Sequence, residues 1–357
     1  MVIEELQLHN WRNAGAVAVD FPPGLTLVTG QNAQGKTNLL EAVFFLATGR
    51  SHRTSHAEEL VGFAHKAAHL RGVIRRDSGT FVLSAAIADG RVNRQRDGKA
   101  FRRGQDPLGD FSAILFAPED LLVLKGAPAE RRRILDLDLG QAAPSYRSLH
   151  ANYAKVLRQR NALLRNYEHP AREMLAAWDM AWAKAAVALT QLRARLVKET
   201  APHLGRRSAE ISGGPPAALV YEPSLSGDTV PEALEQLAAR QEDELRRRTS
   251  LVGPHRDDLR VEIDGRDLRL FGSQGEQRTA LVAFKLAAVE VLSQRPGGAP
   301  VLLLDDVLSE LDQGRRRNLL VAAMVAQTIV TTTEPQLAGM QPDRTIAVRG
   351  GEYERTW

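Results

Sequence analysis

A glycine-rich segment directly after a short apolar run constrains the fold of this chain most strongly. Residues 30–38 read GQNAQGKTN and follow LTLVT, which predicts a buried strand, a tight turn and then a helix. The spacing of Gly30, Gly35, Lys36 and Thr37 is that of a P-loop, where backbone N–H groups and a helix N-terminus converge on phosphates. In such a loop the lysine contributes a charge to the phosphates and the threonine a hydroxyl ligand to Mg²⁺. The alternative, a glycine-rich turn without a ligand, fits the strand and helix context less well.

A strand that ends in two acidic residues completes the pattern expected of a P-loop site. Residues 301–306 read VLLLDD, a buried strand that ends in two carboxylates. We expect Asp305 to hold Mg²⁺ through water and Asp306 to orient or deprotonate the attacking water. Alone, the run is equally typical of a core strand, but together with the P-loop it indicates an ATPase core.

The segment SQGEQ, residues 273–277, precedes a long apolar helix. Ser273 and Glu276 have the spacing of a capping box, which is the simple structural interpretation. The same residues resemble the signature motif of ABC-type ATPases, whose serine reaches the γ-phosphate bound by a partner subunit. One helix N-terminus can serve both purposes.

The order of the patterns predicts an α/β core that is split in sequence by a helical insertion. We expect an N-terminal part of the core at 1–125, a mainly helical insertion at 126–248 and a C-terminal part of the core at 249–357. The 357 residues contain no cysteine, which excludes a disulfide framework and thiolate zinc, and no window is apolar enough to predict a membrane span. We therefore expect a cytoplasmic protein.

Basic residues cluster in two places, although the net charge is only +4. The segment Arg91–Arg103 holds six basic residues and one acid, and no acid occurs between 141 and 167. On a helical wheel, four basic residues fall within about 80°; they are Arg147, Lys155, Arg158 and Arg165. We call this set the basic stripe. Leu149, Tyr153, Val156, Leu163 and Leu164 lie opposite, and Arg160 is an exception.

The basic stripe has two interpretations. One is an ordinary solvated helix face. The other is a surface for the phosphate backbone of duplex DNA, favoured because the stripe has a single sign of charge and aromatic residues are only 5% of the chain. We expect the arginines at 131–133 and 246–248 to pair with nearby acids instead.

Over nearly its whole length the sequence resembles the RecF family of bacterial recombination-mediator ATPases, which are related to SMC proteins. The resemblance rests on LQLHNWRN at 6–13, ATGRSHRT at 47–54, FAPEDLLVLKGAPAERRRILD at 116–136, GPHRDD at 253–258 and LLLDDVLSELD at 302–312. It implies an ABC/SMC-type ATPase head with a helical insertion and no long coiled coil.

The resemblance also implies roles for individual residues. The nucleotide contacts are assigned to Gly30, Gln31, Asn32, Ala33, Gln34, Gly35, Lys36, Thr37, Asn38, Ser273, Gly275 and Gln277. Catalytic roles fall to Lys36, Ser273 and Asp306, and the Mg²⁺ ligands are Thr37 and Asp305. Arg50 and Arg53 match a basic turn that faces phosphates, residues 309–312 match a loop on a dimer seam, and Glu119 loosely matches a glutamine that senses Mg²⁺.

Three departures from the pattern bear on the rate of hydrolysis. Ala33 replaces a glycine, so a positive φ there would be strained. Asp306 is shorter than the usual glutamate, and threonines at 331–333 follow the strand after which transporters place a histidine. We therefore expect slow turnover.

The function implied is an ATP-dependent DNA-binding protein of recombinational repair and replication. ATP is expected to close a head-to-tail homodimer on duplex DNA at gaps, with weak DNA-stimulated hydrolysis, to help load recombinase with RecR- and RecO-type partners. The alternatives are a transporter ATPase subunit, which needs a membrane partner, and a small-molecule P-loop kinase, which needs an acceptor pocket.

Overall fold

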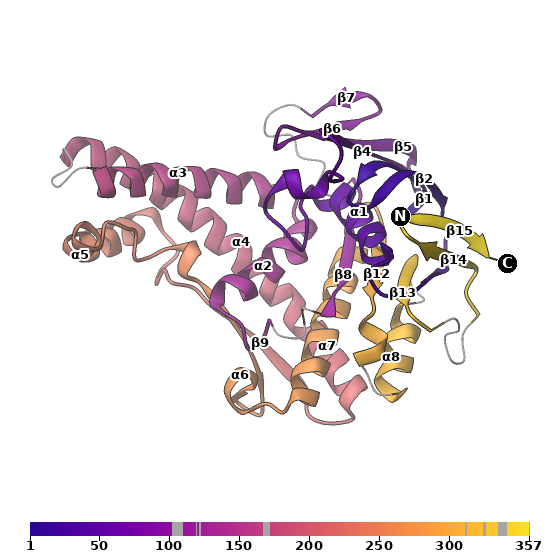
Figure 1. Ribbon diagram of the computed structural model, residues 1–357. Coiled ribbons are helices and arrows are strands. Elements are labelled where there is room, and N and C mark those ends of the chain that lie inside the picture. Colours follow the sequence, from indigo (N-terminus) through magenta and orange to yellow (C-terminus); the bar gives the residue numbers. More distant parts are fainter. Residues whose placement is uncertain are drawn as a thin grey trace.

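The computed structural model describes residues 1–101, 110–118, 120, 123–166, 172–310, 313–323, 326–334 and 341–356. A core of two six-stranded sheets carries a helical arm on one side (Figure 1). Glu119, Leu311 and Asp312 lie outside the described residues.

The central sheet brings together strands from both ends of the sequence. Its order is β15 (Glu352–Thr356), β14 (Arg344–Arg349), β3 (Leu25–Thr29), β13 (Thr328–Thr332), β12 (Val301–Asp305) and β8 (Ala113–Phe116). All neighbours are parallel except β14 and β15. The carboxyl ends of β3, β12 and β13 therefore meet at one edge, where ligands bind in sheets of this kind.

Both faces of the central sheet are covered, which explains why β8 (AILF) and β12 (VLLLD) are apolar almost throughout. On one face Val28, Leu303 and Ile329 pack with α1 (Lys36–Thr48) in one core. On the other face Leu27 and Leu304 join the core built around α7 (Gln274–Ser293).

The second six-stranded sheet is antiparallel and also packs on α1. Its order is β2 (Ala14–Asp20), β1 (Val2–Trp11), β4 (Ala67–Arg76), β5 (Gly79–Ala88), β6 (Arg91–Arg96) and β7 (Lys99–Ala100). Tight turns join β4 to β5 and β5 to β6, with positive φ at Gly79, Asp89 and Gly90.

The helical part comprises α2 (Pro128–Leu137), α3 (Tyr146–Asn166), α4 (Arg172–Ser212) and α5 (Val230–Arg247). In Figure 1 α3 and α5 project from the core, while α4 runs back along α7. α4 is the longest of these helices and continues to Ser212. Its polar last turns are held by Glu290 of α7, which pairs with Arg206 and Arg207.

A small sheet connects the helical part to the C-terminal third of the chain. β9 (Ala217–Glu222) pairs with β10 (Asp258–Ile263), which also pairs with β11 (Arg266–Asp267). Short helices η1 (Ala57–Leu60), η3 (Leu139–Ala142), η4 (Pro254–Arg256), η5 (Val307–Glu310) and α6 (Leu268–Phe271), with the longer α8 (Gln313–Ala323), complete the elements. The division of the chain at 125 and 248 remains our proposal.

Candidate functional site

The glycine-rich loop joins β3 to α1 at the carboxyl edge of the central sheet, as the sequence predicted. A Cβ on Gly30 would lie 2.5 Å from the Val348 carbonyl oxygen, and Gly35 has φ 115°, so both positions require glycine. Ala33 has φ 63°, which confirms the strain expected from its departure from glycine. Gln31, Asn32 and Ala33 are exposed at the tip of the loop.

Lys36 folds back over the loop that precedes it. Its side chain is buried, and Nζ donates to the carbonyl oxygens of Gly30 at 2.7 Å and Gln31 at 2.9 Å. Burial lowers the pKa of Lys36, while the nearby carboxylates of Asp306 and Asp305 act in the opposite direction. The positive charge of Lys36 would therefore also stabilise a phosphate group placed beside it.

Thr37 and Asp305 meet although 268 residues separate them. Thr37 Oγ1 donates to Asp305 Oδ1 at 2.9 Å, and Thr331 Oγ1 donates to the same oxygen at 2.7 Å. A hydroxyl and a carboxylate side by side are the hard oxygen ligands that Mg²⁺ takes from proteins, with water and phosphate completing its shell. The donor set thus fits Mg²⁺.

Thr331 also fixes the backbone of Asp306, the second acidic residue. Its Oγ1 accepts a hydrogen bond from the Asp306 backbone N–H at 2.9 Å, and Asp306 has φ 48°. One buried hydroxyl therefore holds both acidic residues. Sequence reasoning noted Thr331 as a departure and missed this role, although its place at the end of a strand beside β12 was a usable signal.

Residues far away in sequence support the loop from the outside. Gly351 N and Gly350 N donate to Gln34 O at 2.9 Å and to Gln34 Oε1 at 2.6 Å. Tyr353 donates its hydroxyl proton to Gly35 O at 2.9 Å, and Asn13 Nδ2 donates to Gln34 O at 3.1 Å. Asn13 and Tyr353 were not predicted from sequence, because only tertiary packing brings them to the loop.

The two arginines of the GRSHRT turn lie in different surroundings. Arg53 Nη1 donates to Asn38 Oδ1 at 3.0 Å, beside the start of α1. Asn38 also donates to Asn13 Oδ1 at 2.7 Å, which ties the turn to the loop supports. Arg50 instead lines a cavity next to α3.

Ser273 caps α7 as the sequence predicted. Its Oγ accepts from Glu276 N at 3.2 Å, and its own N–H donates to Glu276 Oε2 at 2.8 Å. Ser273 is exposed, whereas Gln277 is buried and donates from Nε2 to Leu268 O at 2.7 Å. The Gln277 side chain thus holds the turn before α7, and Gly275 lies half-buried in the first turn.

The signature segment and the P-loop lie apart in the molecule. In Figure 1 α6, which directly precedes Ser273, lies at the lower edge, while β15, whose Tyr353 contacts the loop, lies at the upper right. Leu270 and Phe271 in α6 are exposed by 65% and 72%. Large apolar side chains exposed next to a polar helix terminus are typical of a surface that is covered by a partner.

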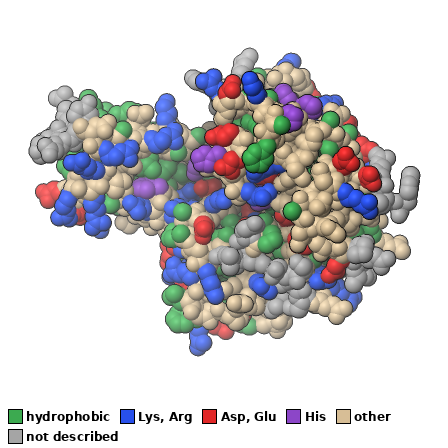
Figure 2. Space-filling view, in the orientation of Figure 1, with side chains coloured by type: hydrophobic (Ala, Val, Ile, Leu, Met, Phe, Trp, Pro, Cys, Tyr) green, Lys and Arg blue, Asp and Glu red, His purple; other side chains and the backbone are tan. Residues whose placement is uncertain are grey.

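The basic stripe runs along α3 on its solvent side. Lys155, Arg158 and Arg165 are exposed, and Arg147 is half-buried beside Gly49. Figure 2 shows blue side chains along this arm. The opposite side packs inward as predicted, with Tyr153, Val156 and Leu164 buried.

The exceptional Arg160 has a structural role. It is buried and bonds Asp179 at 2.7 Å, Glu244 at 2.6 Å and Ser250 Oγ at 2.7 Å. The predicted acid partners of other arginines are found for Arg131, which pairs with Asp258, and Arg246, which pairs with Asp243. For Arg132 and Arg133 the prediction is wrong, because their side chains donate to backbone carbonyls instead. The end of the segment Arg91–Arg103 lies outside the described residues.

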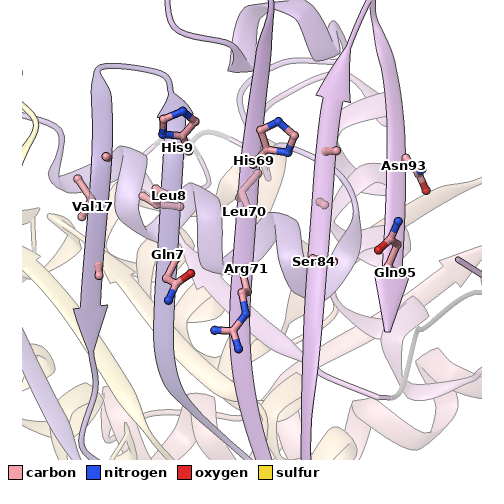
Figure 3. Close-up of a pocket in the computed structure, with 14 residues that line it drawn as sticks. Gln7, Leu8, His9, Val17, His69, Leu70, Arg71, Ser84, Asn93 and Gln95 are labelled. Carbon is pink, nitrogen blue, oxygen red and sulfur yellow. The ribbon is translucent and has the colours of Figure 1, made fainter. Parts of the chain in front are cut away.

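A shallow cavity of about 680 Å³ lies on the outer face of the antiparallel sheet, away from the P-loop. Figure 3 shows the imidazoles of His9 and His69 side by side on neighbouring strands, with Gln7 and Arg71 in the next row. Its side chains are small or uncharged apart from Arg71, and it contains none of the residues predicted for the nucleotide site.

The comparisons with known proteins show the family of this chain. A family model described as the RecF/RecN/SMC N terminal domain matches residues 2–353. The chain is 40% identical over 355 residues to the DNA replication and repair protein RecF of Acidothermus cellulolyticus, with 94% of this chain and 95% of that protein covered. Against the protein of the same name from Lacticaseibacillus casei it is 39% identical over 355 residues, with 96% and 95% covered. The chain belongs to the RecF family.

Solved structures support the same assignment. A structure of the recombination mediator protein RecF-ATP in the RecFOR pathway matches with a TM-score of 0.91 and 29% identity, over 99% of this chain and 97% of that one. An Smc head bound to the C-winged helix domain of ScpA matches with a TM-score of 0.56 at 19% identity, which shows the fold alone. The fold predicted for this RecF-family chain, an SMC/ABC-type ATPase head with a helical insertion, is confirmed. No helix within the described ranges is long and apolar enough to cross a membrane.

Proposed function

We propose that this protein is an ATP-dependent DNA-binding protein of recombinational repair and replication, in which ATP closes a head-to-tail homodimer on duplex DNA. The observation that carries the proposal is the geometry of two separate half-sites in one chain. The P-loop with its carboxylates forms one half, and the exposed, capped Ser273 beside Leu270 and Phe271 forms the other.

Bound nucleotide with Mg²⁺ would supply the γ-phosphate to be hydrolysed and a charge that stabilises the leaving group. Lys36 would turn from its loop carbonyls toward the β- and γ-phosphates, and Thr37 and Asp305 would hold Mg²⁺. Asp306 would position the attacking water from the fixed backbone conformation that Thr331 maintains. Aspartate reaches less far than glutamate, so this arrangement favours slow hydrolysis, suited to a switch.

The second half-site needs a partner subunit. A serine at a helix N-terminus stabilises an anion that lies on the helix axis, because the helix dipole and free N–H groups point there. In a head-to-tail dimer that anion is the γ-phosphate held by the other chain, and Gly275 lets the partner's phosphate approach the first turn. ADP lacks this phosphate, so it should leave the protein monomeric.

Duplex DNA would bind to the closed dimer through the basic stripe of α3. The stripe has a single sign of charge and points into solvent, so it would contact the phosphate backbone without reading sequence. A relative of known structure is described as a recombination mediator in the RecFOR pathway, which supports a role in loading recombinase with RecR- and RecO-type partners.

Light scattering with ATP, ADP and no nucleotide tests this proposal directly. We expect dimers only with ATP, and a Ser273→Arg variant that binds ATP but stays monomeric. Ser78→Arg makes the same change in the exposed turn between β4 and β5 of the antiparallel sheet, and this variant should dimerise normally. An Asp306→Asn variant should form longer-lived dimers. Dimerisation of Ser273→Arg with ATP would rule out the composite site.

A further inference from the structure

A second arginine-rich site lies where the core meets the helical part, separate from the P-loop. A cavity of about 230 Å³ is bounded by Arg50, in the turn after α1, and by Arg132 and Arg133 of α2. Tyr153 of α3 and His255 of η4 complete its wall. The two parts of the chain thus contribute cations to one open cavity.

The three arginines have no carboxylate partner within the part of the chain that the structure describes. The guanidinium group of Arg50 forms no hydrogen bond or ion pair there. Arg132 Nη1 donates to the backbone carbonyl of Asp257 at 2.6 Å, and Arg133 donates to the carbonyls of Ser51 and His52. Backbone carbonyls satisfy N–H groups but carry no net charge, so none of the three guanidinium groups has a directly bonded counter-ion among the described residues.

The one acid among the described residues that line the cavity is already neutralised. Asp136 accepts from Arg193 Nη2 at 2.8 Å and from the Tyr146 hydroxyl, and it lies 3.2 Å from His150 Nε2. Arg193 in turn is paired with Asp257 at 2.9 Å. Asp136 and Asp257 are thus both paired with Arg193, and they act on Arg132 only at longer range.

Of the two histidines that line the cavity, His255 does not contribute to the positive charge. His255 Nδ1 lies 2.6 Å from the Tyr153 hydroxyl, and Nε2 lies 3.1 Å from the Ser250 carbonyl. Burial lowers the pKa of His255 to about 4, so the ring is neutral at pH 7. The bond to a carbonyl then requires the proton on Nε2, and Nδ1 accepts from Tyr153. Burial lowers the pKa of Arg132 and the charge of Arg193 adds to this effect, while Asp257, Asp136 and Asp258 act in the opposite direction.

We propose that this cavity binds a phosphate group, held between Arg50 of the core and Arg132 and Arg133 of the helical part. Planar guanidinium groups match phosphate oxygens in pairs, and an anion shared by two parts of the fold would fix their relative orientation. The phosphate can come from a DNA backbone, because Ala154 and Leu157 of the same helix that carries the basic stripe line the cavity, or from a free phosphate compound. The site itself does not depend on the proposed function.

Two measurements on the whole chain distinguish these sources. The first is calorimetric titration with pyrophosphate after saturation with ADP and Mg²⁺, which keeps the probe out of the P-loop. The second is binding of a short duplex in the presence of a non-hydrolysable ATP analogue over a range of salt concentrations. Both are carried out on wild type, Arg50→Gln, Arg132→Gln and Arg132→Lys.

Arg195→Gln is the matched control, because it removes the same charge from an exposed position on α4. Binding of a free phosphate compound predicts an affinity for pyrophosphate that falls about tenfold in the Arg50→Gln and Arg132→Gln variants and less in Arg132→Lys. Binding of a DNA backbone predicts that the salt dependence of duplex binding falls by about one unit for each lost contact.

Exposed Arg50 tests the site even if Arg132→Gln fails to fold. If neither measurement separates Arg50→Gln and Arg132→Lys from Arg195→Gln, the proposal is overturned. A wild-type protein that binds no duplex would contradict the proposed function, and the pyrophosphate titration would then decide the arginine site by itself.

Discussion

At the scale of single residues, Ala33 shows how the nucleotide loop is held in an unfavourable conformation. A left-handed backbone at a residue with a Cβ costs about 1–2 kcal/mol relative to the right-handed one. The loop keeps this conformation because Gln34, the next residue, is bonded on its backbone and its side chain to Gly351 and Gly350. The fold therefore organises the loop amides, which we propose to bind phosphate, before any ligand arrives.

Lys36→Met should abolish tight ATP binding while leaving the fold intact. The substitution keeps an unbranched side chain of similar length and removes the charge that would face the β- and γ-phosphates. We expect at least a tenfold loss in affinity, about 1.4 kcal/mol or more, in a fluorescent nucleotide titration. Unchanged affinity would show that the loop does not bind the phosphates.

Thr331→Val should impair both stability and turnover. The change removes a buried hydroxyl that donates to Asp305 and accepts from Asp306 N, and a buried polar group left without a partner costs about 1–3 kcal/mol. Urea unfolding should show this loss, and ATP hydrolysis should fall more than ATP affinity because Asp306 loses its fixed position.

The control for this variant is Thr26→Val on the adjacent strand β3. Thr26 is equally buried, but its hydroxyl has no hydrogen-bond partner among the described residues. Removing it should leave stability unchanged or raise it. Equal losses in the two variants would mean that Thr331 only fills space.

At the scale of elements, helix α3 packs one face against the interior and exposes the other to solvent. Its inner face includes Arg160, which joins α3 to α4 and α5 through Asp179 and Glu244. Because this inner network fixes the helix, the basic stripe presents its charges in a fixed row. A fixed row loses less side-chain and backbone entropy on binding a regular polyanion.

Replacing Lys155, Arg158 and Arg165 by Ala should weaken duplex binding to the same extent for every sequence. The logarithmic dependence of affinity on salt should flatten by about one unit per lost phosphate contact. Replacing Lys184, Arg195 and Lys198 by Ala, all exposed on α4, also removes three charges and should leave the slope unchanged. An unaltered slope in the folded triple variant would leave only the interpretation of a solvated face.

How much of this could be read from sequence depends on how local each feature is. The strand, loop and helix around Lys36, the capping box of Ser273 and the faces of α3 follow from short-range patterns, and these predictions are confirmed. The supports of the loop at Asn13 and Tyr353 could not be predicted, because nothing in their own segments indicates what they contact. The inward orientation of the Gln277 side chain could not be predicted either, because its partner is the backbone carbonyl of Leu268.

At the scale of the whole molecule, buried titratable groups make stability depend on pH. Burial lowers the pKa values of His52 and His255 to about 4, from an ordinary value of 6.5. Between these values the unfolded chain binds protons that the folded protein does not, so acid destabilises the fold. Burial raises the pKa of Asp138 to about 6, and this carboxyl acts in the opposite direction between pH 6 and 4.

The two histidines together lose twice what Asp138 gains as the pH falls. The free energy of unfolding should therefore decrease by about 1.4 kcal/mol for each pH unit from 6 to 4. His52→Gln should nearly abolish this dependence, and Asp138→Asn should make it steeper. His65→Gln, at an exposed position, should not change it. Denaturant titrations at several pH values give the slopes, and a wild-type stability that rises toward pH 4 would contradict the assignment.

The strand order of the central sheet has a consequence for biosynthesis. β3, which carries the P-loop, lies between β13 and β14, and both of these are encoded about 300 residues further along the chain. A ribosome that adds roughly 5–20 residues per second exposes β3 for about 15 to 60 s before either neighbour exists. During that interval the apolar strand LTLVT lacks both of its neighbours in the central sheet, so we expect nucleotide binding to begin only after the C-terminal strands have been synthesised.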